Sequence, residues 1–159
     1  MTRGELAKRN FLSGYNCSQA VVLAFSDLTG FDKESLALLS QPFGTGMGGM
    51  REVCGTVSGM WFVLGAIFGD PNPGNPQKRN ELYKRVRELA DKFEQDNGSI
   101  VCRELLGLVP PGTRKGLITD KAIKREKRPC PELCEYAANI LDEYIKEHRK
   151  DLLKTESIA

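Results

Sequence analysis

The sequence predicts an all-α fold: a single-domain multi-helix bundle with short helices and a glycine-rich loop. Apolar residues recur at helical spacing, capping residues stand where those segments begin, and no segment alternates apolar and polar residues as a half-buried strand does. With 159 residues, 40% of them hydrophobic and 28% charged, the chain has the size and composition of one globular domain. Residues 1–159 are therefore expected to form one helical domain, with a polar C-terminal tail from about residue 147.

Three helices are predicted in the first forty residues, each bounded by a capping residue or a glycine. They run from Glu5 to Leu12, from the cap Asn16 to Gly30, and from Lys33, after the cap Asp32, to Ser40. Residues 41–50 contain four glycines and are expected to form a loop without regular structure. An apolar helix then runs from Arg51 or Glu52 to Phe68, where a proline-rich turn ends it.

The clearest helical pattern in the chain opens at the cap Asn75, with Pro76 as its first helical residue, and ends at Asn97. One face of this helix is apolar and comprises Leu82, Val86, Leu89 and Phe93. The remaining predicted helices are a short one from Ser99 to Gly107, a brief basic one from Asp120 to Arg128, and a final one that begins at Cys130 and continues past Tyr144.

Four of the five cysteines fall in or beside a predicted first helical turn: Cys17, Cys54, Cys102 and Cys130. A helix start carries a partial positive charge and free backbone N–H groups, so a thiol placed there ionises more easily. The pattern predicts one site at which helix starts converge on thiolates, although scattered core cysteines would also explain it. The glycines Gly48, Gly49, Gly55 and Gly59 are expected to let backbone approach that site closely.

Cys134 lies inside the final helix on a stripe with Ala138, Leu141 and Ile145. This position predicts a small buried apolar residue, with a resolving thiol for Cys130 as the alternative. The cysteine spacings exclude several familiar sites, since the chain has no C-x-x-C pair and its single histidine, His148, stands in the polar tail. A shared site would therefore form only through folding.

Several motifs together resemble one known family. They are NCSQAV near the start, GGMREVCGTVSG, GSIVCRELLG, and RPCPEL at the head of the last helix. In this order they are similar to the C_GCAxxG_C_C family, whose members are described as redox-active proteins, from about Asn16 to Leu141. The resemblance places the family's four cysteines on the four singled out above and its glycines on Gly55 and Gly59. It also places Thr56 where the family has alanine, and leaves Cys134 outside the pattern.

Three functions fit these residues. The first is an iron–sulfur cluster, of the [2Fe–2S] type, bound by Cys17, Cys54, Cys102 and Cys130 for electron transfer or redox sensing; related sequence in split-Soret cytochromes c implies such a site. A zinc ion would use the same four ligands. The second is metal-free dithiol chemistry, with Cys54 or Cys130 as the catalytic thiolate. The third is an adaptor in which the cysteines only pack.

Composition limits the partners and the compartment. A net charge of +2 is too small a bias to indicate nucleic acid. The longest uncharged stretch, residues 53–69, is too short to span a membrane, and the N-terminus lacks an export signal, so we expect a cytoplasmic protein without membrane insertion. An electron-transfer protein is the expected partner, and Gly55-x-x-x-Gly59 would suit a close helix contact in the core or across a homodimer.

Overall fold

The computed structural model describes residues 1–110, 112 and 128–156. The regular elements of the described chain are all helices, as predicted. They are α1 (Arg3–Leu12), α2 (Cys17–Leu23), α3 (Ser26–Thr29), α4 (Lys33–Ser40), the 3₁₀ turn η1 (Gln41–Phe43), α5 (Gly44–Met47), α6 (Gly55–Phe68), α7 (Pro76–Asn97), α8 (Cys102–Leu105) and α9 (Cys130–Glu156). In the described part of the chain, no helix is both long enough and apolar enough to cross a membrane.

Local hydrogen bonds explain where the predicted helices begin. Asn16 and Gln19 form a capping box at the start of α2: the Asn16 side chain accepts from the Gln19 backbone N–H, and the Gln19 side chain accepts from the Asn16 backbone N–H. Asp32 caps α4 and Asn75 caps α7 with Pro76 following, as the sequence indicates. These contacts need only neighbouring residues, which is why the pattern of capping residues located them.

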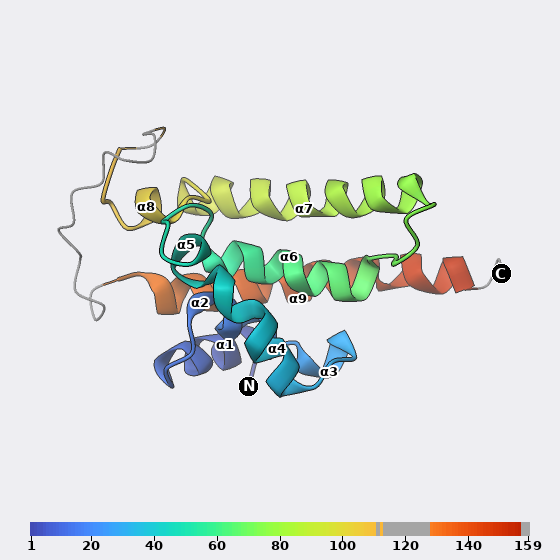
Figure 1. Ribbon diagram of the computed structural model, residues 1–159, viewed down its shortest axis with the longest axis horizontal. Coiled ribbons are helices and arrows are strands. Elements are labelled where there is room, and N and C mark those ends of the chain that lie inside the picture. The colour runs from blue at the N-terminus through green and yellow to red at the C-terminus, as the bar shows by residue number, and fades with distance from the viewer. Residues whose placement is uncertain (111, 113–127, 157–159) are drawn as a thin grey trace.

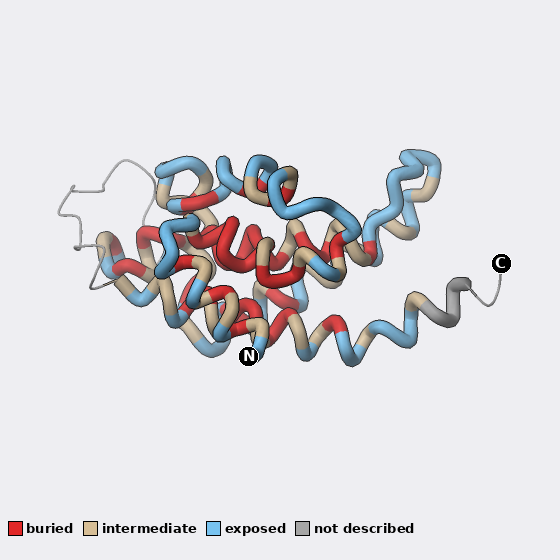
Figure 2. Tube along the Cα trace, turned by 90° about the horizontal axis from the view of Figure 1, so that it is seen from below, coloured by how far each residue is buried: buried red, intermediate tan, exposed pale blue. Residues whose placement is uncertain are grey.

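Helix α6 is the centre of the bundle, packed against α2, α7 and α9, while α1 covers α2 and α9 (Figure 1). The buried residues lie mostly along α6 and where the other helices pack against it. The start of α7 and the end of α9 are mostly exposed (Figure 2). The starts of α2, α6 and α9, together with α5 and α8, gather at one end of the molecule (Figure 1). This gathering is what brings distant cysteines together.

One helix and one loop in the first fifty residues differ from the prediction. The helix expected from Asn16 to Gly30 is broken, because the backbone at Phe25 leaves helical geometry where its side chain is fully buried. The loop 41–50 is not wholly irregular, since it holds η1 and α5. However, Thr45 and Gly46 within α5 have left-handed backbone angles, so that this segment is a winding loop and not a regular helix.

The start of α6 and the end of α9 also differ from the prediction. Helix α6 begins at Gly55, because residues 51–54 run alongside residues 100–103, with an isolated antiparallel bridge between Val53 and Val101. Helix α9 continues to Glu156, so the described part of the tail expected from about residue 147 is helical. The brief basic helix expected from Asp120 to Arg128 lies almost wholly outside the described residues.

Candidate redox site: a cavity lined by four cysteines

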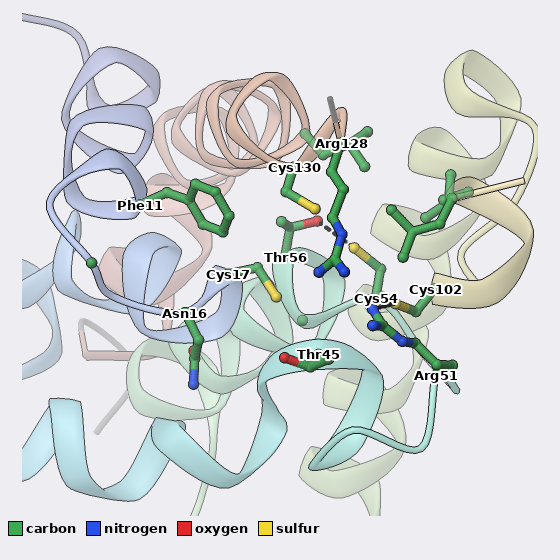
Figure 3. A pocket seen from close by; sticks show the side chains of 15 residues that line it. Phe11, Asn16, Cys17, Thr45, Arg51, Cys54, Thr56, Cys102, Arg128 and Cys130 are labelled. Atoms are coloured by element: carbon green, nitrogen blue, oxygen red, sulfur yellow. Dashed lines mark hydrogen bonds between the residues drawn. The ribbon is translucent and has the colours of Figure 1, made fainter. Parts of the chain in front are cut away.

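Four cysteines occupy helix starts, as the sequence predicts. Cys17, Cys102 and Cys130 are the first residues of α2, α8 and α9, and Cys54 directly precedes α6. All four line a single cavity of about 150 Å³, and their side chains point into the same space from different elements (Figure 3). We call Cys17, Cys54, Cys102 and Cys130 the cavity cysteines.

Most of the remaining cavity wall is apolar or cationic, with the neutral polar residues Asn16, Thr45 and Thr56 beside it. Phe11, Leu105, Leu106 and Leu133 supply its apolar parts, and the side chains of Arg51 and Arg128 reach the same space (Figure 3). No aspartate or glutamate is among the described residues that line it. The cavity is therefore suited to a group that carries negative charge and is largely shielded from water.

Backbone pairing holds Cys54 beside Cys102. The Cys54 N–H donates to the Ile100 carbonyl at 2.7 Å, and the Cys102 N–H donates to the Glu52 carbonyl at 2.6 Å. The Arg103 guanidinium, which is almost fully buried, forms an ion pair with Glu52 at 2.9 Å and donates to the Arg51 carbonyl at 3.2 Å. Hydrogen bonds and an ion pair thus hold together two segments whose cysteines have 47 residues between them in the chain.

Unusual backbone geometry marks the loop between α4 and α6. Thr45, Met47 and Arg51 have φ angles of 56°, 68° and 58°, values that side-chain-bearing residues rarely adopt. Within this loop Gly46 lies directly against the site, since a Cβ added there would stand 2.6 Å from the Cys102 Cβ. Such strain is concentrated at functional sites in many proteins, and it places Arg51 at the cavity.

Two polar side chains contact cavity sulfurs. The Thr56 Oγ1 lies 3.1 Å from the Cys54 Sγ, and Arg51 donates from Nη1 to the Cys102 Sγ at 3.8 Å. Both contacts stabilise negative charge on sulfur. Neither residue stood out as a site residue in the sequence. For Thr56, the sequence offered one indication, its position two residues after a cysteine at a helix start. Arg51 reaches the cavity only because of the path of its loop, which the sequence does not indicate.

Burial dominates the acidity of the cavity thiols. It raises the pKa of Cys54 to about 12 and the pKa of Cys130 to about 11, and the neighbouring Cys17 sulfur adds to both. The pKa of Cys102 is also raised by burial, with Arg51 opposing the shift. These pKa shifts are upward, whereas the helix starts alone would lower the pKa values. The loss of hydration on burial outweighs the partial positive charge of the helix starts. Without a bound cation, these three thiols stay protonated at neutral pH.

The four glycines expected at the site have different positions. Gly55 lines the cavity, and a Cβ added to it would collide with the Cys17 Sγ. Gly59 instead lets α6 approach α2, since its Cβ would stand 3.1 Å from the Ser18 carbonyl oxygen and from the Val21 Cβ. Gly48 and Gly49 are not among the residues that line the cavity; both have left-handed φ angles and turn the loop that follows α5.

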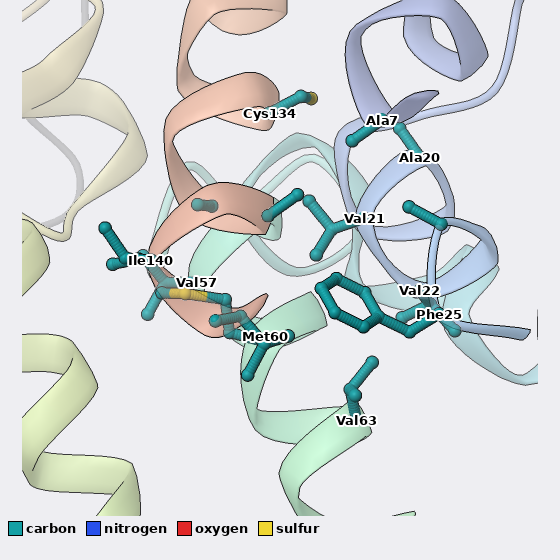
Figure 4. Packing of buried hydrophobic residues seen from close by; sticks show 14 of the residues in the cluster. Ala7, Ala20, Val21, Val22, Phe25, Val57, Met60, Val63, Cys134 and Ile140 are labelled. Carbon is teal, nitrogen blue, oxygen red and sulfur yellow. The ribbon is translucent and has the colours of Figure 1, made fainter. Parts of the chain in front are cut away.

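Cys134 lies outside the cavity. Its side chain is fully buried in the hydrophobic core between α9 and the N-terminal helices (Figure 4), where its Sγ lies 4.0 Å from the Cys17 carbonyl oxygen. Ala138, Leu141 and Ile145, the residues of its predicted stripe, are buried as well. The prediction of a small apolar core residue is confirmed.

The cavity cysteines surround a space and not a point. Among the described residues, no three histidine, cysteine, aspartate or glutamate side chains are gathered closely enough to hold one metal ion. Thiolates around a single zinc ion, each about 2.3 Å from the metal, would lie roughly 4 Å apart. The cavity, at about 150 Å³, has room for a group of several atoms.

Comparison with family models matches residues 15–144 to the family described as "Putative redox-active protein (C_GCAxxG_C_C)". The chain belongs to this family. The match runs from the loop before α2 into α9 and so covers all four cavity cysteines and the helices that carry them. No curated protein and no solved structure matches the chain.

Proposed function

We propose that this member of the C_GCAxxG_C_C family binds an iron–sulfur cluster, of the [2Fe–2S] type, through the four cavity cysteines. The cluster would store one electron for transfer to a protein partner or for redox sensing. The observation that carries the proposal is the convergence of four thiols, from four separate helix starts, on one cavity. Four cysteines are the usual ligand set of such clusters.

The surroundings of the thiols support the proposal. A cluster with four thiolate ligands carries net negative charge. Arg51 and Arg128 offset this charge, as do the starts of the long helices α6 and α9, whose backbone N–H groups face the cavity end of each helix. The absence of carboxylates among the described lining residues avoids further repulsion.

The size of the cavity favours a cluster over one zinc ion. A cluster contains irons and bridging sulfides, so its four thiolates stand farther apart than they do around a single ion. A space of about 150 Å³ lined by all four cysteines has room for such a group. Apolar side chains such as Phe11 and Leu133 would shield the bound group from water.

The thiol acidities argue against metal-free dithiol chemistry. A nucleophilic or resolving cysteine reacts as the thiolate, and activated thiols have lowered pKa values. Here burial raises the pKa values of Cys54 and Cys130, the two cysteines expected to serve as catalytic thiols. Iron ions would supply the positive charge that keeps them deprotonated.

The test is the iron, acid-labile sulfide and visible absorption of protein purified without oxygen, measured beside two matched variants. Wild-type protein is expected to contain stoichiometric iron and sulfide. Cys54→Ala is expected to lose both, while Cys134→Ala, which removes a buried thiol outside the cavity, keeps them. One zinc per chain without iron would replace the proposal with a zinc site. Metal-free protein whose cysteines oxidise reversibly in pairs would replace it with dithiol chemistry.

A further inference from the structure

Of the two polar side chains described above as contacting a cavity sulfur, Thr56 makes the shorter contact, and it stands where the resembling family motif has alanine. Its side chain is fully buried, and its Oγ1 lies 3.1 Å from the Cys54 Sγ. We propose that the Thr56 hydroxyl donates a hydrogen bond to the Cys54 thiolate and thereby raises the reduction potential of the four-cysteine site. This inference rests on the proposed cluster and adds to it a residue that sets its potential.

The direction of the hydrogen bond follows from the chemistry of the sulfur. Between a hydroxyl and a neutral thiol, either atom can donate. A cysteine sulfur bound to iron has lost its proton and can only accept. In the described part of the chain, the Thr56 hydroxyl has no other hydrogen-bond partner, so its proton is directed to the Cys54 Sγ once iron is bound.

A hydrogen bond to a ligand sulfur stabilises the reduced site more than the oxidised one. Reduction by one electron adds one negative charge, part of which resides on the ligand sulfurs. The donor therefore binds the reduced form more tightly, and hydrogen bonds to the sulfurs are among the factors that set cluster potentials. Because Cys54 and Thr56 are both buried, little solvent screens the contact.

Helix α6 provides a matched control two residues further along. Ser58 is also buried near the start of α6, but its hydroxyl donates to the Gly55 carbonyl at 3.2 Å and not to a sulfur. Replacing Ser58 perturbs the same turn of the same helix without touching a cavity sulfur. Arg51 is a weaker comparator, because its contact with the Cys102 Sγ is longer, at 3.8 Å.

The experiment is an anaerobic redox titration with dithionite as the one-electron donor, followed by the visible absorption of the site. Thr56→Val keeps the shape of the side chain and removes the donor. At the wild-type midpoint, the ratio of reduced to oxidised site is expected to fall about tenfold, which is a lowering of about 59 mV for a one-electron couple. Thr56→Ser, which restores a hydroxyl, and Ser58→Ala are expected to titrate near wild type.

Iron content and far-UV circular dichroism of each variant separate the outcomes. Thr56→Ala, which carries the family's residue, serves as a second donor-free variant in case valine disturbs the packing. Donor-free variants that keep their iron and titrate at the wild-type potential would overturn the inference while leaving the cluster in place. Wild-type protein without iron would overturn the proposed function, and this inference with it.

Discussion

Gly55, the first residue of α6, lies directly against the sulfur of Cys17. A side chain here would meet the Cys17 Sγ, and its Cβ would also stand 3.1 Å from the Phe43 carbonyl oxygen and the Ser18 nitrogen. The Cys17 side chain would have to move away, and the two backbone neighbours would also have to shift slightly. The small size of Gly55 is thus required by the site and not by the helix.

Replacing Gly55 with alanine is therefore expected to displace Cys17 and to reduce the iron content of protein purified without oxygen to less than half of the wild-type value. Gly65→Ala is the matched control, because it lies in the same helix and an added Cβ meets nothing within 4 Å. Alanine there should keep the iron and stabilise the protein by about 0.5–1 kcal/mol, as expected for glycine replacement inside a helix. Equal iron in both variants would contradict the role assigned to Gly55.

At the scale of elements, the pairing of residues 51–54 with residues 100–103 holds one side of the cavity together. Its backbone hydrogen bonds are supplemented by the ion pair between Arg103 and Glu52. The Arg103 side chain is only 9% exposed, whereas that of Glu52 is 35% exposed. The pair is therefore half-shielded from solvent, and its loss leaves the carbonyl of Arg51 without one of its donors.

Arg103→Gln is expected to lower the free energy of unfolding by about 1–3 kcal/mol, the usual cost of leaving buried polar partners unsatisfied. Urea denaturation measures this loss, and a double-mutant cycle with Glu52→Gln isolates the pair itself. Lys84→Gln is the control, because it breaks an exposed pair with Glu88 on α7 at 3.9 Å that should contribute less than about 0.5 kcal/mol. If the two variants lose similar amounts of free energy of unfolding, the ion pair between the paired segments stabilises the protein no more than an exposed ion pair does.

At the scale of the whole molecule, Arg3 ties the N-terminal helix to two distant parts of the chain. Its guanidinium forms ion pairs with Asp27 at 2.6 Å and Asp142 at 3.3 Å, and it lies over the Phe25 ring at 4.9 Å. The hydrogen bond from Arg3 holds the pKa of Asp27 below its usual 3.8. A carboxylate with a lowered pKa in the folded state stabilises the protein above its unfolded pKa, and this stabilisation is lost as the pH falls through the folded value.

Arg3→Gln is accordingly expected to destabilise the protein by about 1 kcal/mol at pH 7, a modest figure because Asp27 is 61% exposed and solvent screens the pair. The difference in free energy of unfolding between wild type and variant should become smaller as the pH is lowered from 5 to 2, because Asp27 becomes protonated. Urea denaturation at several pH values measures it. If this difference in free energy of unfolding stays constant over the range, the effect of Arg3 comes from its contact with Phe25 and not from the carboxylates.

Local patterns identified most of the fold. The caps Asn16, Asp32 and Asn75 and the apolar face of α7 located their helices, because a cap and a helical face involve residues a few positions apart. The errors occurred where distant segments act on the backbone. Residues 51–54 are not helical because they pair with residues 100–103, and no residue near Arg51 carries a signal of that pairing.

The sequence by itself determined the helical class, the placement of four cysteines at helix starts, and the resemblance to the redox family. Each of these depends on short motifs or on the type of residue at one position. The tertiary structure alone decided that the four thiols share one cavity, that Cys134 is excluded from it, and that Thr56 and Arg51 contact sulfurs. The physical reason is separation along the chain: 36, 47 and 27 residues lie between successive cavity cysteines, and only the packing of α2, α6, α8 and α9 brings such distant positions together.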